Sequence, residues 1–247
     1  MSTEILVAGV AVAFFAAACY SVTGFGFALV LTPIMAIVWD VKPVVVTGVI
    51  LSTAGLIPLL LDARGHVPIG RVSTMFVASL GGIPLGVFLL ERLDADAIQV
   101  MVALTVMIAG VLLYLAPHLS AGRDSMRGRA VAGFLGGALG SSTSMGGPPV
   151  VVYLLGREPD IHTFRATLIA YFLPGNILTL VAFALVGQVT GDVLLLSGAA
   201  LPAVGAGIAF GIWLRRHVQA ERFRTLVLGV LVATSAVVLI STAGGLG

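Results

Sequence analysis

Charged side chains are scarce in this chain. Of its 247 residues only 10% are charged, whereas 59% are hydrophobic, and the mean hydropathy is +1.13. A soluble domain carries about 25% charged residues. The composition therefore excludes an ordinary soluble domain. It predicts an integral membrane protein, for which the lipid bilayer is the main partner.

Cysteine, metal-ligand clusters and basic patches are also missing. Cys19 is the single cysteine, which excludes an internal disulfide and a cysteine-rich metal site. The four histidines lack the spacing of a metal pair, and the arginines are scattered through loops. We therefore expect no metal, no cofactor, no enzymatic activity and no nucleic acid partner. The sequence leaves the coupling ion open, and it is compatible with a homo-oligomer without requiring one.

What the chain has instead is a series of apolar runs. A helix needs about 20 apolar residues to cross the hydrocarbon core of a bilayer. The runs that reach this length are 43–61, 72–90, 97–116, 166–187, 191–214 and 223–243. The other runs form two pairs, 5–22 with 27–39 and 129–141 with 148–156, whose second members are too short to span comfortably.

Each pair is interrupted by a break rich in glycine and hydroxyl residues. The first break is Ser21–Phe27 and the second is Ser141–Pro149. Irregular backbone leaves hydrogen-bonding groups unpaired, so inside a bilayer it must line a cavity or be buried in protein. Two such breaks, one in each half of a membrane chain, are typical of a transporter's binding site.

The two halves of the chain resemble each other. Residues match at a shift of 120: Asp40 with Asp160, Thr47 with Thr167, and Gly26 with Gly146. Two GxxxG pairs, which favour close helix crossing, match at a shift of 125: Gly82/Gly86 with Gly207/Gly211. We therefore predict an all-α membrane protein of two four-element repeats, each a broken helix pair plus three transmembrane helices. The first repeat is 1–119, the polar linker is 120–129, and the second repeat is 130–247.

Basic residues predict how the broken pairs are placed, because Lys and Arg are enriched in cytoplasmic loops. If each pair crosses the membrane once, the 13 Lys and Arg residues divide with little asymmetry. If each pair enters and leaves on one side as a re-entrant hairpin, only Lys42 and Arg92 lie opposite all the others. We favour the hairpins, which invert the halves relative to each other and place both termini outside the cytoplasm.

The breaks predict an anion site. A helix start offers free N–H groups and partial positive charge, which favour an anion, and proline suits the first helical position. The expected substrate-binding residues are Ser141, Ser142, Thr143, Ser144, Gly146, Gly147 and Pro148 of the second break and Thr23, Gly24, Phe25 and Gly26 of the first. Because the first break is bulkier, we expect the second to be the anion cradle and the first a wall or gate. The alternative is that the glycines only permit packing and the hydroxyls bond to their own helices.

Two further residues are candidates for the site. Arg165 draws anions to the cytoplasmic mouth or completes the site; alternatively it extends to the interface and pairs with Glu158 or Asp160. Asn176 is a polar residue at mid-span. It binds either the substrate or the backbone of a hairpin.

Several stretches resemble the TauE/SafE family of sulfite and organosulfonate exporters. The matching residues are Thr23–Ala28 with Pro33, Gly140–Pro149, and Phe164–Thr167. The resemblance covers both repeats and their order, and its most specific part is Gly-Gly-Pro-Pro at 146–149. It implies export of a small sulfur-containing anion, such as sulfite or a short sulfonate, across a bacterial inner membrane.

The sequence thus favours a secondary transporter that moves a small anion by alternating access around the two breaks. Two alternatives stay open. One is a channel for an anion or small solute that is lined by the same breaks. The other is a membrane assembly factor that transports nothing.

Overall fold

The structure is a computed structural model that describes residues 2–62, 67–115, 124–155, 157–158 and 160–217. Within these ranges the chain forms helices and turns and no strand. The helices are α1 (Thr3–Thr23), α2 (Phe27–Met35), α3 (Val41–Asp62), α4 (Ile69–Arg92), α5 (Ala95–Leu115), α6 (Met126–Thr143), α7 (Gly147–Leu154), α8 (Ile161–Leu185) and α9 (Gly191–His217). Each of them overlaps an apolar run that the sequence predicted, although α2 and α7 end before their runs do. The predicted run 223–243 lies outside the described residues.

Length and hydropathy make several of these helices candidate membrane spans. The candidates are Thr3–Thr23, Val41–Leu60, Ile69–Arg92, His162–Leu185 and Gly191–Leu214. The helices α2 and α7 have 9 and 8 residues, so at 1.5 Å per residue they reach about 14 and 12 Å, less than half of a hydrocarbon core. The chain is therefore an all-helical, multi-pass membrane protein that also contains short helices unable to span.

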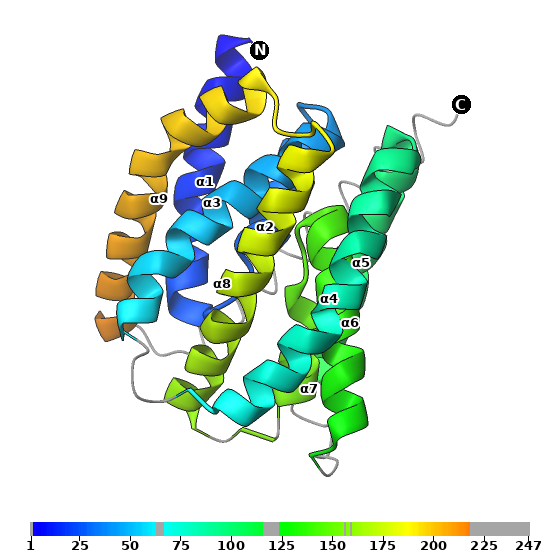
Figure 1. Cartoon of the computed structure of the whole chain (residues 1–247). Coiled ribbons are helices and arrows are strands. Elements are labelled where there is room, and N and C mark those ends of the chain that lie inside the picture. The colour runs from blue at the N-terminus through cyan, green and yellow to red at the C-terminus, as the bar shows by residue number, and fades with distance from the viewer. Residues whose placement is uncertain (1, 63–66, 116–123, 156, 159, 218–247) are drawn as a thin grey trace.

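The two short helices follow breaks that approach from opposite ends of the molecule (Figure 1). From the end that holds the N-terminus, α1 runs inward and α2 turns back toward that same end. From the opposite end, α6 runs inward and α7 turns back in the same manner. The chain thus enters and leaves each break at one end, which is the arrangement of the expected hairpins.

Glycines let α4 of the first half pack backbone to backbone against α6 of the second. A Cβ placed on Gly82 would lie 2.1 Å from the carbonyl oxygen of Phe134, and one on Gly86 would lie 2.2 Å from that of Ala138. Real Cβ atoms do not approach backbone this closely. Only glycine therefore fits at these two positions, as expected for small residues at membrane helix crossings.

The same contact recurs between α9 and α1. A Cβ on Gly207 would lie 2.3 Å from the carbonyl oxygen of Phe14, and one on Gly211 would lie 2.5 Å from that of Ala18. Phe14 and Ala18 stand 120 residues before the partners in the other contact, which is the shift at which the halves match. Each half thus packs its GxxxG helix on the broken helix of the other half.

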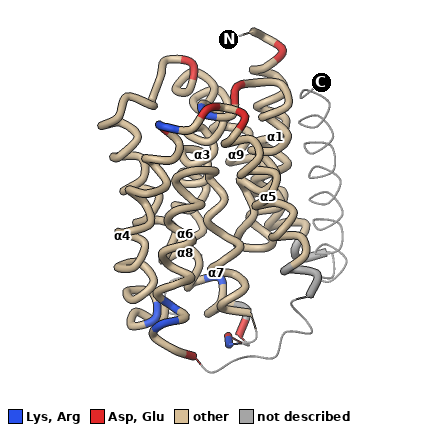
Figure 2. Tube along the Cα trace, turned by 90° about the vertical axis from the view of Figure 1, so that its right-hand side faces the viewer, with Lys and Arg blue, Asp and Glu red and all other residues tan. Residues whose placement is uncertain are grey.

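Charged residues gather toward the two ends of the helices (Figure 2). The end with the N-terminus, called here the acidic end, holds two described basic residues beside a larger set of acids: Lys42 and Arg92 beside Glu4, Asp40, Glu91, Asp94, Asp96 and Asp192. The opposite, basic end holds the starts of α4, α6 and α8, with Arg71, Arg127, Arg129, Arg157 and Arg165. Because positive loops favour the cytoplasm, we expect the basic end to face it.

Residues 120–123 of the predicted polar linker, 120–129, lie outside the described residues. The last residues of the linker are helical, because α6 already begins at Met126. The side chain of Ser125 accepts a hydrogen bond from the N–H of Gly128 at 3.1 Å. This N-cap satisfies one of the unpaired donors at a helix start, so the helix begins before its apolar stretch does.

The orientation can be tested by labelling single cysteines in a Cys19→Ser background. Ser125 and Asp96 are both exposed, at the basic and the acidic end respectively. We expect an impermeant thiol reagent added outside intact cells to label D96C and to leave S125C unlabelled until the membrane is opened. Labelling of S125C in intact cells would contradict the assigned orientation.

Candidate functional site

The first break is a tight turn made of two glycines in the left-handed conformation. The helix α1 ends at Thr23, and Gly24 has φ 80° while its N–H donates to the carbonyl of Tyr20 at 2.8 Å. Gly26, with φ 96°, begins α2. A side chain at such φ values is strained. The two glycines therefore allow the chain to reverse within three residues.

The second break reverses at Ser144, which has φ 62° and is the only non-glycine residue of the described chain with positive φ. Its hydroxyl lies 2.5 Å from the carbonyl oxygen of Thr143 and 2.6 Å from the hydroxyl of Thr32 in α2. The left-handed conformation costs a non-glycine residue about 1–2 kcal/mol. These local bonds help to hold Ser144 in that conformation, and the Thr32 contact joins the two hairpins directly.

A glycine on α3 makes room for this junction. A Cβ on Gly48 would lie 3.0 Å from the hydroxyl oxygen of Ser144 and 3.3 Å from that of Thr32. The backbone of α3 at Gly48 thus packs directly against the contact between the two broken pairs. Both breaks belong to one packed centre, although they lie 120 residues apart in the sequence.

The two breaks line one cavity with a volume of about 60 Å³. A water needs at least about 10–15 Å³ measured in the same way, so the cavity holds a few waters or one small ion. The expected site residues that line it are Phe25 and Gly26 of the first break, Ser144, Gly146 and Gly147 of the second, and Asn176 of α8. The described lining contains no charged side chain.

The other expected hydroxyls bond to helix backbone instead. Ser141 donates to the carbonyls of Ile83 and Gly137, Ser142 to that of Ala138, and Thr143 to that of Leu139, at 2.8–2.9 Å. Thr23 donates to the carbonyl of Cys19 at 2.9 Å. These residues, with Gly24 and Pro148, are not among the residues that line the cavity. For the hydroxyls, the structure shows the alternative in which they bond to their own or a neighbouring helix.

The starts of α2 and α7 differ in the number of backbone N–H groups that they offer. Residues Phe27, Ala28 and Leu29 in the first turn of α2 line the cavity, and no side chain caps that helix. The first N–H groups of a helix have no intrahelical partner, so α2 presents free donors. In α7, Pro148 and Pro149 occupy the first turn and have no N–H at all. The start of α2 therefore keeps more backbone N–H groups than the start of α7.

Spanning helices supply lining residues that the sequence did not single out. The amide nitrogen of Asn176 donates to the hydroxyl of Ser52 in α3 at 3.2 Å, so a polar bridge crosses between two spans. Ser79 of α4 and Tyr171 of α8 also line the cavity. These residues can be recognised in the sequence as polar positions inside apolar runs. The sequence alone does not show that their helices meet.

Comparison with known families agrees with this geometry. The family model described as "Sulfite exporter TauE/SafE" matches residues 9–238. The chain belongs to this family. The search of curated proteins and the search of solved structures each found no match. Membership assigns a membrane transporter fold and function class, and the resemblance noted in the sequence is confirmed.

In this TauE/SafE family member, Arg165 lies against the first break rather than in the cavity wall. Its Nη2 donates to the carbonyl oxygen of Ser21 at 2.8 Å, and only 8% of the residue is exposed. The expected alternative of a pair with Glu158 or Asp160 is wrong. Glu158 accepts from Arg71 at 2.6 Å, and Asp160 caps the start of α8.

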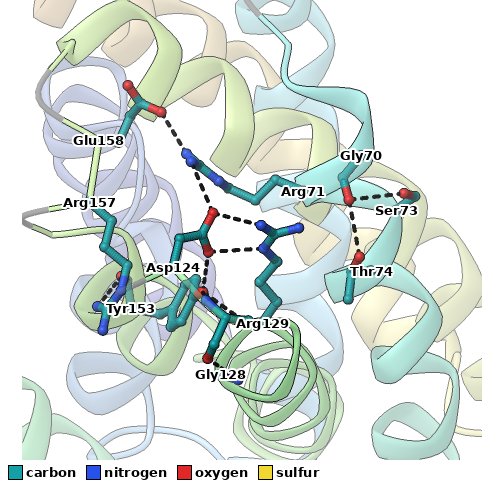
Figure 3. A network of polar contacts seen from close by, with 11 residues as sticks. Gly70, Arg71, Ser73, Thr74, Asp124, Gly128, Arg129, Tyr153, Arg157 and Glu158 are labelled. Carbon is teal, nitrogen blue, oxygen red and sulfur yellow. Dashed lines mark hydrogen bonds and ion pairs between the residues drawn. The ribbon is translucent and has the colours of Figure 1, made fainter. Parts of the chain in front are cut away.

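A network of charges closes the basic end (Figure 3). Asp124, before α6, accepts hydrogen bonds from Nε and Nη2 of Arg129 at 2.9 and 2.7 Å and from Tyr153 of α7. Arg71 of α4 reaches both Asp124, at 3.3 Å, and Glu158, at 2.6 Å. The network therefore ties both arms of the second hairpin to each other and to α4.

The acidic end has no such network at the matching position. A shift of 120 relates Arg129 to Gly9, and a shift of 125 relates Arg71 to Leu196. A Cβ on Gly9 would lie 2.6 Å from the side chain of Leu196. At these matching positions, charged side chains join the helices near the basic end, whereas an apolar contact joins α1 and α9 near the acidic end.

The network fixes the ionisation of Asp124. The hydrogen bond from Arg129, with those from Tyr153 and the charge of Arg71, holds the pKa of this carboxyl well below its usual range. A carboxyl whose pKa is lower in the folded state stabilises the fold above its unfolded pKa of about 3.9, and this stabilisation is lost as the pH falls. Asp124 therefore stays ionised across the physiological range.

We expect Asp124→Asn to lower the free energy of unfolding by about 1 kcal/mol at pH 7, the upper value for partly exposed ion pairs. Thermal unfolding in detergent from pH 3 to pH 8 measures the effect. The difference between wild type and variant is expected to be constant above about pH 5 and to shrink below about pH 4. A difference that does not depend on pH would contradict the assigned role of the carboxylate.

The close contact within the second hairpin can be tested at adjacent glycines. A Cβ on Gly146 would lie 2.4 Å from the carbonyl oxygen of Gly136, whereas one on Gly147 would find its nearest neighbour, Phe25, at 3.8 Å. We expect Gly146→Ala to reduce the free energy of unfolding by about 2 kcal/mol through overpacking. Gly147→Ala, the matched control, is expected to change it far less. Equal thermal stability of the two variants would refute the tight crossing of α6 and α7.

Proposed function

We propose that this protein is a secondary transporter that exports a small sulfur oxyanion, sulfite or a short organosulfonate, across a bacterial inner membrane. Membership of the sulfite exporter family supplies the class of substrate. The observation that carries the proposal is the single cavity that both breaks line. A break at mid-membrane that faces a cavity is the arrangement by which transporters bind small ions.

The chemistry of the cavity fits a small anion. The first turn of α2 offers N–H donors and the positive end of its dipole. The Asn176 amide and the Ser52 hydroxyl add further polar groups beside them. A neutral lining with several donors can bind an anion without a buried cation. Release then does not require breaking an ion pair between buried charges.

The proposed contact residues are those expected residues that reach the cavity. They are Phe25, Gly26, Ser144, Gly146, Gly147 and Asn176, with Ser52 added from the structure. The cavity volume suits an ion of a few heavy atoms better than a larger organic substrate. In this proposal Phe25 and Phe27 supply apolar wall, and the donors orient the oxyanion.

The matched glycine contacts support two inverted repeats that move against each other. Each half contributes one hairpin and one GxxxG helix, and each GxxxG helix packs on the other half's broken helix. In alternating access, one repeat rocks against the other around a fixed site. The hydroxyl contact of Thr32 with Ser144 lies at the point where the two hairpins meet, so it is where such a motion would pivot.

Flux into proteoliposomes tests the function. Purified protein is assayed with sulfite, sulfate, thiosulfate, short sulfonates and small carboxylates as competing anions. We expect saturable flux with sulfite or a short sulfonate preferred. Preference for carboxylates would reject the substrate class, very fast unitary flux would indicate a channel, and no flux of any anion would reject transport.

The sign of the bound charge can be tested with Asn176→Asp, with flux measured from pH 6 to pH 9 because the new carboxyl repels an anion only when it is ionised. A negative charge beside a bound oxyanion repels it strongly in a site of low dielectric. We expect the saturable sulfite flux to fall by at least about tenfold, which corresponds to about 1.4 kcal/mol. Gln188→Glu makes the same chemical change in a loop at the acidic end and serves as the matched control. Unchanged or increased flux in Asn176→Asp would contradict an anion in this cavity.

A further inference from the structure

Arg165 is a buried cation without a counter-charge among the described residues. Only 8% of the residue is exposed, its Nη2 bonds to a neutral carbonyl, and its Nε has no hydrogen-bond partner. A buried charge that is neither paired nor fully hydrogen-bonded is costly. The described acids nearest in sequence, Glu158 and Asp160, bond to Arg71 and to the start of α8 instead. The guanidinium therefore has donors to spare for an anionic ligand.

The position of Arg165 relates it to the cavity. On α8 it lies seven residues before Phe172, which lines the cavity. Seven residues are two turns of helix, so both side chains lie on one face, separated by about 10 Å along the axis. Across from α8, the Arg165 side chain contacts Gly24, two residues before Gly26 in the cavity wall. Arg165 thus lies beside the cavity, on its basic-end side.

The bond to Ser21 fits a cation that exchanges partners. Carbonyl oxygens at the end of a helix carry partial negative charge, so the end of α1 attracts the guanidinium. A full negative charge is a stronger partner for the same group, because charge-assisted hydrogen bonds are about twice as strong as neutral ones. An arriving oxyanion can therefore compete for the guanidinium and loosen its hold on the first hairpin.

We propose that Arg165 is a second anion-binding site, which receives a small oxyanion at the basic end before it reaches the cavity. This inference rests on the proposed transport function. The planar guanidinium presents several fixed donors, which match the oxygens of a sulfur oxyanion better than the single ammonium of lysine does. In this site the guanidinium also donates to the Ser21 carbonyl.

The test compares KM for sulfite uptake into proteoliposomes among three arginine variants. We expect Arg165→Gln to raise KM by about tenfold, the loss of about one charge-assisted hydrogen bond. Arg165→Lys keeps the charge but loses the planar geometry, and its KM is expected to rise by about threefold. Arg127→Gln removes an exposed arginine from the same end and is expected to leave KM unchanged.

The outcomes separate the inference from the function on which it rests. If wild type shows no saturable flux of any oxyanion, the proposed function fails and this site fails with it. If wild type transports sulfite and Arg165→Gln lowers only the maximal rate, Arg165 is a positioning residue for the first hairpin and the inference is wrong. If Arg165→Gln does not fold, Arg165→Lys decides, because an unchanged KM in that variant overturns the site.

Discussion

The need to pair every backbone N–H and C=O inside a bilayer governs this structure. Two helices stop at the centre of the protein, and each stop leaves polar backbone that lipid cannot satisfy. The chain meets this need by bringing the two stops together, so that Ser144 of one hairpin contacts Thr32 of the other. The first turn of α2, whose N–H groups have no partner within the helix, faces a small cavity rather than lipid. The candidate site is therefore a consequence of how the breaks are buried.

The burial depends in turn on glycine. At Gly82, Gly86, Gly207 and Gly211 a methyl group would strike a carbonyl of the partner helix. The close approach of α4 to α6 and of α1 to α9 holds the long arm of each hairpin against a spanning helix of the other half. Without these crossings the short arms, α2 and α7, would have no rigid frame. The glycine content of the chain is thus part of the mechanism that positions the cavity.

The helices and the breaks could be predicted from sequence, because a bilayer demands long apolar runs and glycine marks where they stop. The cavity could be predicted only in part. Gly26, Ser144 and Asn176 reach it as expected, but Ser141 and Ser142 bond to backbone carbonyls that no sequence pattern reveals. The sequence places Glu158 and Asp160 near Arg165, whereas the partner of Arg165 is the carbonyl of Ser21. The sequence itself shows that the second break has few backbone N–H donors, because Pro148 and Pro149 have none.

The contacts at the two ends differ in kind, so the free energies of separating them depend on different conditions. Parting Arg71 and Arg129 from Asp124 and Glu158 lets water and salt solvate charges, so high ionic strength lowers the free energy of that opening. Parting Leu196 from the Gly9 backbone exposes apolar surface, which raises the heat capacity and makes the opening depend on temperature. An inward-open and an outward-open form of one chain would thus respond to different physical variables. These two forms therefore need not be equally populated.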